Sequence, residues 1–83
     1  MDTAHVDLGD CRRLVDLLAR NAHDVWAQMR LNDGWAYGPE RDDRRKLHPC
    51  LVRFEDMPEP DQAFDRAMIA EFLRAAMLLG FRR

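Results

Sequence analysis

Two blocks of apolar residues at helical spacing, separated by a long stretch without any period, limit what this chain can fold into. Apolar residues that recur in steps of three and four lie along one stripe of a helix. The first block consists of Cys11, Leu14, Val15, Leu18, Ala22, Val25, Trp26 and Met29. The second consists of Phe64, Met68, Phe72, Ala76 and Leu79, widened by Ile69, Leu73 and Met77. The sequence therefore predicts two amphipathic helices whose apolar stripes face a core.

Residues at the ends of both blocks are typical of helix boundaries. Asp10 is a plausible N-cap for the first helix, and Gly34 can adopt the left-handed conformation that ends it. Asp56 and Glu59 have the spacing of a capping box at the start of the second helix. Gly80 is expected to end that helix.

The segment between the helices, residues 33–57, is rich in glycine, proline and charge and has no helical period. Residues 35–37 and 51–54 could each form a short extended segment. A connection this long in a small domain is more often functional than idle. We expect a mainly α fold, with two amphipathic helices joined by a long irregular linker that contains short extended segments.

The chain length of 83 residues allows one domain, which we place at residues 10–83 after an N-terminal tail at residues 1–9. Thirteen basic and fifteen acidic residues give a net charge of −2, which argues against duplex nucleic acid as a partner. Two cysteines are too few for a disulfide scaffold and are expected to be reduced. Neither a secretory signal nor a membrane span is recognisable in the sequence, so we expect a cytoplasmic protein without membrane contact.

Several ordered segments resemble a known family. They are Asn21–Trp26, Gly34–Pro39, Arg41–Asp43, Leu47–Val52 and the ending Leu78–Phe81. In this order and spacing, the chain resembles a single ryanodine-receptor repeat from about Leu14 to Phe81. The resemblance implies two helices joined by a long linker with short strands. It does not imply ion conduction, because the chain contains no channel region.

The resemblance also implies a partner. Repeats of this family occur as tandem pairs in animal calcium-release channels, where the pair encloses a cleft, and as short stand-alone or fused proteins in bacteria and phages. A single repeat could recreate the pair as a homodimer. A physical argument points the same way, because two helices and a loop leave one side open that a second copy would cover.

Six residues form the candidate ligand site: Trp26, Trp35, Tyr37, Arg41, Lys46 and His48. The three large aromatic residues could stack on a planar ligand, and arginine can bind phosphate or carboxylate through two parallel hydrogen bonds. The resemblance supports this hypothesis, since paired repeats of the family hold nucleotide-like and aromatic molecules in their cleft. The alternative interpretation is that the tryptophans belong to the core and that the charged run 41–46 is a solvated loop.

Two catalytic or metal-binding interpretations of His48 and Cys50 are less favoured. A zinc site with His23 or Cys11 lacks the paired ligands that zinc sites normally show. A Cys50–His48 nucleophile lacks an identifiable orienting residue. We therefore expect no enzyme activity, no metal and no cofactor.

The sequence thus predicts a non-enzymatic cytoplasmic binding module that senses a small anionic, aromatic, nucleotide-like ligand in the cleft of a homodimer. The alternative is a structural module for protein–protein interaction without a small-molecule ligand.

Overall fold

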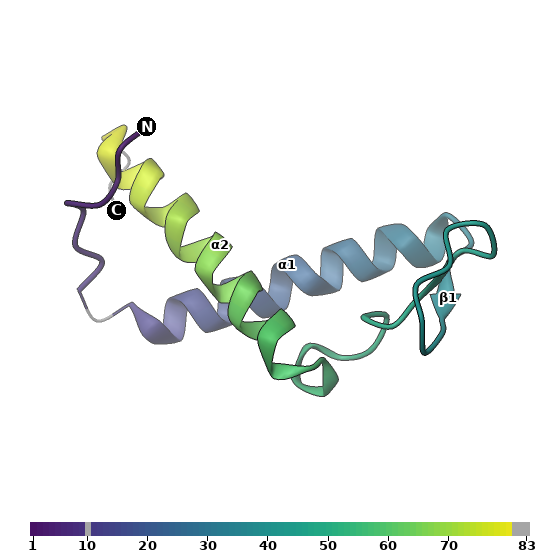
Figure 1. Ribbon diagram of the computed structural model, residues 1–83. Coiled ribbons are helices and arrows are strands. Elements are labelled where there is room, and N and C mark those ends of the chain that lie inside the picture. The colour runs from purple at the N-terminus through teal and green to yellow at the C-terminus, as the bar shows by residue number, and fades with distance from the viewer. Residues whose placement is uncertain (10, 81–83) are drawn as a thin grey trace.

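Two long helices and the linker between them make up almost all of the fold, which is known from a computed structural model that describes residues 1–9 and 11–80. Helix α1 spans Arg12–Asn32 and helix α2 spans Glu59–Leu78. The helices cross and then diverge, so that the molecule measures 42 × 22 × 21 Å, and the linker folds at the far end of α1 (Figure 1). The prediction of a mainly α fold with an irregular linker is confirmed.

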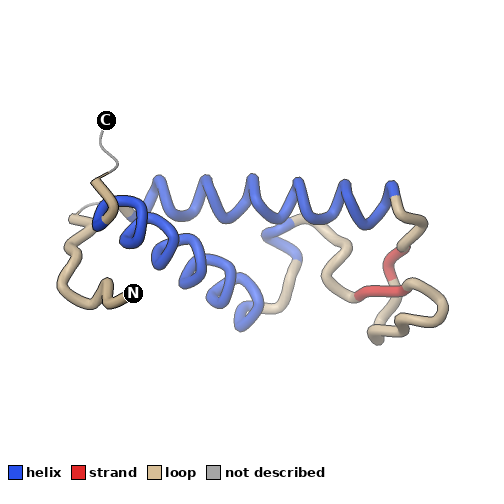
Figure 2. Tube along the Cα trace, turned by 90° about the horizontal axis from the view of Figure 1, so that it is seen from above, coloured by secondary structure: helices blue, strands red, loops and turns tan. Residues whose placement is uncertain are grey.

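The linker contains three short elements. Strand β1, Ala36–Tyr37, pairs in parallel with strand β2, Leu47–His48, and a 3-10 turn, η1, spans Phe54–Asp56 (Figure 2). The extended segment expected at residues 35–37 is thus present. The one expected at residues 51–54 is wrong: the second strand lies earlier, and Phe54 begins η1.

The two strands pack closely because Gly38 has no side chain. A Cβ atom at Gly38 would lie 2.7 Å from the Cβ of Leu47, a distance that side chains do not tolerate. The loop between the strands turns at Lys46, whose φ of 57° lies in the left-handed region. Lys46 is held there by a hydrogen bond of 2.8 Å from its Nζ to the carbonyl oxygen of Asp33.

The helix ends differ in part from the expectation. The Asp56–Glu59 capping box is wrong, because Pro58 is the N-cap of α2 and its carbonyl accepts the Asp61 N–H at 3.0 Å. The Asp56 carboxylate instead accepts a hydrogen bond from Arg53 Nε at 3.0 Å. Gly34 and Gly80 do follow the helices in the left-handed region, with φ of 87° and 89°. The Asp10 cap lies outside the described residues.

The core is small and forms where η1 packs between the helices. Its buried apolar members are Ala19 of α1, Phe54 of η1 and Met57, with Ile69 of α2 packed against them. Phe54 is 2% exposed, and the Arg20 and Arg66 guanidinium carbons lie 5.2 Å and 5.4 Å from its ring centroid. Asp16, Arg20 and Arg66 are tied together, because each arginine Nε donates to an oxygen of that carboxylate.

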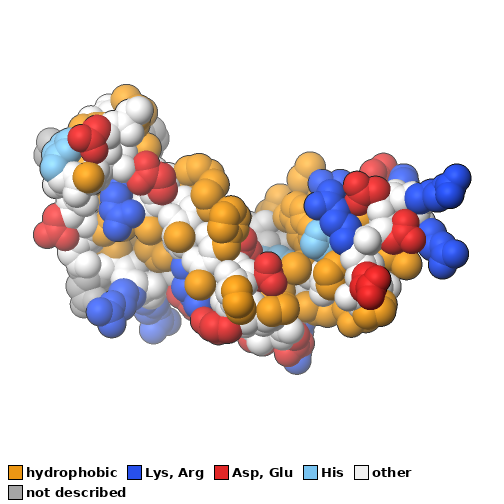
Figure 3. Space-filling view, viewed as in Figure 1, with side chains coloured by type: hydrophobic (Ala, Val, Ile, Leu, Met, Phe, Trp, Pro, Cys, Tyr) orange, Lys and Arg blue, Asp and Glu red, His pale blue; other side chains and the backbone are white. Residues whose placement is uncertain are grey.

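Most of the predicted apolar stripe on α2 is not buried, which corrects the expectation that it faces a core. Phe64 is 65% exposed, Phe72 57% and Met68 41%. In the space-filling view, apolar side chains follow the arm of the molecule that α2 forms, and basic side chains project at the linker end (Figure 3). Large exposed apolar patches of this kind mark interaction surfaces or ligand grooves.

The N-terminal tail contacts α2 and does not extend freely into solvent. The Thr3 side chain is buried, and its hydroxyl lies 2.6 Å and 2.8 Å from the two carboxylate oxygens of Glu71. The tail and the end of α2 therefore lie at the same end of the molecule (Figure 1).

Candidate functional site

A groove opens between the middle of α1, the first half of α2 and the linker. It has a volume of about 330 Å³, which is within the range of small-molecule sites. We call it the α1–α2 groove. Its lining residues are Ala22, His23, Trp26, His48, Cys50, Met57, Asp61, Phe64, Asp65, Met68, Ile69 and Phe72.

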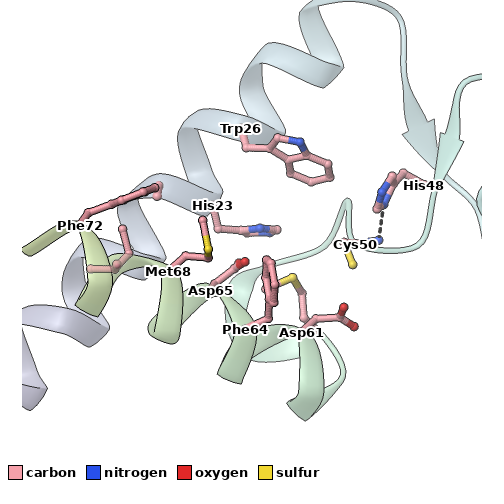
Figure 4. A pocket seen from close by; sticks show the side chains of 12 residues that line it. His23, Trp26, His48, Cys50, Asp61, Phe64, Asp65, Met68 and Phe72 are labelled. Atoms are coloured by element: carbon pink, nitrogen blue, oxygen red, sulfur yellow. Dashed lines mark hydrogen bonds between the residues drawn. The ribbon is translucent and has the colours of Figure 1, made fainter. Parts of the chain in front are cut away.

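Aromatic and imidazole rings from three elements face one another across this groove (Figure 4). Trp26 stacks on His23 with ring centroids 5.5 Å apart, and its edge meets the ring of His48 at 5.0 Å. Phe64 approaches from α2 on the opposite side (Figure 4). Such walls suit a planar ring, which gains affinity by stacking and by burial.

His23 supports the wall from within and ties α1 to the linker. Its side chain is 5% exposed, and its Nε2–H donates to the Val52 carbonyl oxygen at 2.7 Å. This bond requires the proton on Nε2 and fixes the plane of the ring against Trp26.

His48 presents a neutral ring to the groove. Its Nδ1 accepts the backbone N–H of Cys50 at 3.0 Å, which requires an unprotonated nitrogen. Burial, followed by the positive charges of Arg41 and Arg30, lowers the pKa of His48 below its usual 6.5. The end of the groove at His48 is therefore near two cations, one from the linker and one from α1.

Arg30 is the cation that the sequence interpretation missed. Its guanidinium carbon lies 5.2 Å from the ring centroid of Trp35 and 5.9 Å from that of Trp26. Within residues 1–9 and 11–80 it has no carboxylate partner. An arginine held on two indole faces keeps its N–H groups available for an anion, since stacking does not use them.

The opposite side of the groove carries negative charge. Asp61 and Asp65 lie one helical turn apart on α2, and both line the groove. Burial raises the pKa of Asp65, and Asp61 raises it further, whereas His23 acts to lower it. The α1–α2 groove is therefore polarised, with cations near His48 and carboxylates on α2.

The structure brings together some of the six predicted ligand residues. Trp26 and His48 line the groove. Trp35 does not line the groove, and its ring centroid lies 6.3 Å from that of His48. Tyr37 pairs with His48 in the small sheet but is 56% exposed and does not line the groove.

The two predicted cations have other contacts. Arg41 Nε donates to the Asp43 carboxylate at 2.8 Å in an exposed ion pair, although its charge reaches His48. Exposed pairs of this kind are weak, so Arg41 can exchange its partner. Lys46 is directed at Asp33 and does not line the groove.

The α2 side of the groove was missed because its residues had a simpler explanation. Asp61 lies in the first turn of α2, where an acidic residue is favoured by the helix dipole. The spacing of Phe64, Met68 and Phe72 predicts a core stripe. Their spacing of four residues did place them on one face. The unused signal was Asp65, a carboxylate set within that apolar stripe.

The Cys50 thiol, which lines the groove, is poorly suited to nucleophilic chemistry. Burial, with the charges of Asp61 and Asp65, raises the pKa of Cys50, which favours the protonated thiol over the reactive thiolate. Both cysteines are free in the described part of the chain. No group of three metal-ligand side chains gathers among residues 1–9 and 11–80.

None of the helices in the described part of the chain combines the length and apolar character that crossing a bilayer requires.

The chain matches a known family over nearly its whole length. The model of the family described as RyR domain matches residues 1–82. A stretch of 36 residues is also 42% identical to Rubredoxin-2 from Desulfovibrio desulfuricans. That match covers 43% of this chain and 58% of that protein. Because less than two thirds of the relative is covered, no activity of that protein is inferred for this chain.

Proposed function

This chain belongs to the RyR domain family, and we propose that it is a non-enzymatic module that binds a planar, anionic, nucleotide-like molecule in the α1–α2 groove. Membership of this family is consistent with a binding or interaction module. One observation carries this proposal: a groove with aromatic walls has cations at one end and carboxylates on one side. A nucleotide carries its ring and its phosphate at separate ends, and the groove offers a different chemistry to each.

The ring is proposed to lie between Trp26 and His48 of one wall and Phe64 of the other. These side chains come from α1, the linker and α2, so the site exists only in the folded chain (Figure 4). Stacking on an aromatic side chain contributes about 1–3 kcal/mol per base. Trp35 would add to the site indirectly, through its contacts with Arg30 and His48.

The anionic group is proposed to bind at the His48 end. Arg30 would donate from its position over the two indole rings, and Arg41 would turn from Asp43 toward the ligand. Arginine is the residue that best matches the geometry of a phosphate.

A second copy is proposed to complete the site. Phe64 and Phe72 are mostly exposed and Met68 is partly exposed, and all three line the groove. A homodimer that covers these side chains would remove apolar surface from water and close the groove into a cleft. The two free cysteines are in keeping with a reducing, cytoplasmic location, which is part of the same proposal.

Thermal unfolding in the presence of nucleotides tests the proposal. We expect a ligand present at about 100 times its Kd to stabilise the fold by about 2.7 kcal/mol. We expect Arg30→Gln and Trp35→Ala to remain folded and to lose most of this stabilisation, and Arg41→Ala to lose part of it. Arg44→Gln is the matched control, because Arg44 is exposed and does not line the groove. No stabilisation by any nucleotide at high concentration would contradict the proposal.

The exposed stripe on α2 also favours a second candidate function, a module that docks on another protein. In that case, Phe72→Glu would release a co-purifying partner, whereas nucleotides would leave the unfolding temperature unchanged.

A further inference from the structure

Two carboxylates in the α1–α2 groove differ from the other acidic groups around the core. Asp16, Glu55, Glu59 and Glu71 each accept a hydrogen bond from an arginine or a threonine. The side chains of Asp61 and Asp65 accept no hydrogen bond from any residue in the ranges 1–9 and 11–80. Their acceptor oxygens are therefore free for a group that enters the groove.

Asp65 is the more enclosed of the two. It is half-buried, whereas Asp61 is exposed, and its side chain extends from α2 toward His23 (Figure 4). His23 does not serve as its donor, because the Nε2–H of that ring is bonded to the Val52 carbonyl. A partly desolvated acceptor without a donor costs free energy that a bound donor would recover.

We propose that Asp65, with Asp61 one turn away, selects ligands whose planar ring carries an exocyclic amino group. This inference rests on the proposed function and names the class of ring that the groove accepts. An amino group donates to a carboxylate in a short, charge-assisted hydrogen bond. A ring with a carbonyl at the same position places its carbonyl oxygen against the Asp65 carboxylate. Both groups are hydrogen-bond acceptors, so such a ring is rejected.

The polarity of the groove also sets the orientation of the ligand. Arg30 and Arg41 are near the His48 end, and Asp65 lies on α2 beside His23 and Phe64. A ring amino group directed at Asp65 leaves the anionic group of the same molecule at the cationic end. The reverse orientation would place the anion next to two carboxylates.

Two pairs of nucleotides that differ at one ring position test the selection. AMP has an amino group where IMP has a carbonyl, and CMP and UMP differ in the same way. Isothermal titration of the unmodified chain is expected to give a Kd at least about tenfold lower for the amino member of a pair. Equal affinities within both pairs would overturn this inference and leave the proposed function in place. The absence of binding by all four nucleotides would overturn both.

Substitution of Asp65 separates direct selection from a structural effect. An asparagine amide can donate to a ring carbonyl, so Asp65→Asn is expected to weaken AMP and strengthen IMP, which removes or reverses the preference. Asp24→Asn is the matched control on α1, exposed and outside the groove, and should keep the preference. If Asp65→Asn weakened both nucleotides equally, or left the preference intact, the assignment to Asp65 would be wrong.

Discussion

His48 occupies the position where the linker, α1 and the groove meet, and its contacts define its protonation state. Its Nδ1 accepts the Cys50 N–H, and the edge of Trp26 packs on its ring. The charges near it come from Arg30 on α1, Arg41 and Asp43 on the linker, and Asp61 on α2. Burial and the two arginines outweigh the carboxylates, so the neutral ring is the stable form in the folded chain.

The pH dependence of stability follows from this shift. The unfolded chain takes up a proton at His48 near pH 6.5, whereas the folded chain does so only at lower pH. The contribution of His48 to stability is therefore fully present above pH 6.5 and is lost as the pH falls from there toward the lower pKa of the folded state. We expect the NMR titration of the His48 ring to give a pKa below 6.5, and Arg41→Gln to raise it.

Thermal unfolding of variants checks the assignment to His48. His48→Gln should lose less stability than the unmodified chain as the medium is acidified, because the titrating group is absent. His5→Gln, which changes an exposed histidine of the tail, should behave like the unmodified chain. A His48 ring that titrates at or above 6.5 would contradict the description of this end of the groove.

At the scale of single residues, part of the site could be predicted from the sequence. Trp35 and His48 could be selected because a large ring and a histidine lie in a linker motif that the helices do not explain, and Trp26 because it is a large aromatic residue on the stripe of α1. Arg30 could not, because an arginine in the last turn of a helix is common and favours the negative end of its dipole. Its role depends on where Trp35 lies after the turn, and only the folded chain provides that position.

The 3-10 turn η1 contributes more to the core than its length suggests. Phe54 is buried between the helices, and Gln62 Nε2 donates to the carbonyl oxygens of Glu55 at 3.3 Å and Met57 at 2.9 Å. These contacts attach the start of α2 to the linker. The helices therefore contact each other both directly and through η1, and their apolar stripes meet only in part.

Truncation of Phe54 tests this role. Phe54→Ala is expected to destabilise the fold by about 3–5 kcal/mol, which is most of the stability of a small domain. Phe54→Leu retains much of the volume, and we expect a loss of about 1.5 kcal/mol that denaturant titration can measure. Leu17→Ala, a truncation at a half-exposed position on α1, should cost less than about 1 kcal/mol. Equal losses for Phe54→Leu and Leu17→Ala would contradict a core centred on η1.

At the scale of the elements, both helices could be predicted from their spacing, but their surroundings could not. The period shows which residues share a face, and it does not show what covers that face. Phe64 and Phe72 belong to the predicted stripe and remain exposed. The capping box failed for a local reason, since Arg53 takes up the Asp56 carboxylate that would have capped α2.

The molecule as a whole has a small core and a large apolar surface for a chain of 83 residues. A domain of this size buries little apolar surface within itself, so burial contributes little to its stability. A second copy would bury more apolar surface and add to that stability. The resemblance to a family of paired repeats and the open side of the two-helix layer led to the same prediction. The exposed stripe of α2 is the surface that a second copy would cover.

Sedimentation equilibrium tests the homodimer. We expect a concentration-dependent species of twice the mass of one chain, with Phe72→Glu shifting it to the monomer because a charge in an apolar interface is unpaired. Leu17→Glu on α1 is the matched control and should leave the equilibrium unchanged. A monomer at all concentrations, with and without nucleotide, would contradict pairing through α2.

Titration of the isotope-labelled chain with AMP by NMR tests most directly whether a nucleotide-like ligand occupies the α1–α2 groove. We expect shifts concentrated at Trp26, His48 and Phe64, at the Arg30 guanidinium, and at Asp65. The tail and the first turns of α1 are expected to remain unaffected. Shifts that avoid the groove, or a spectrum unchanged at millimolar AMP, would contradict binding in the groove.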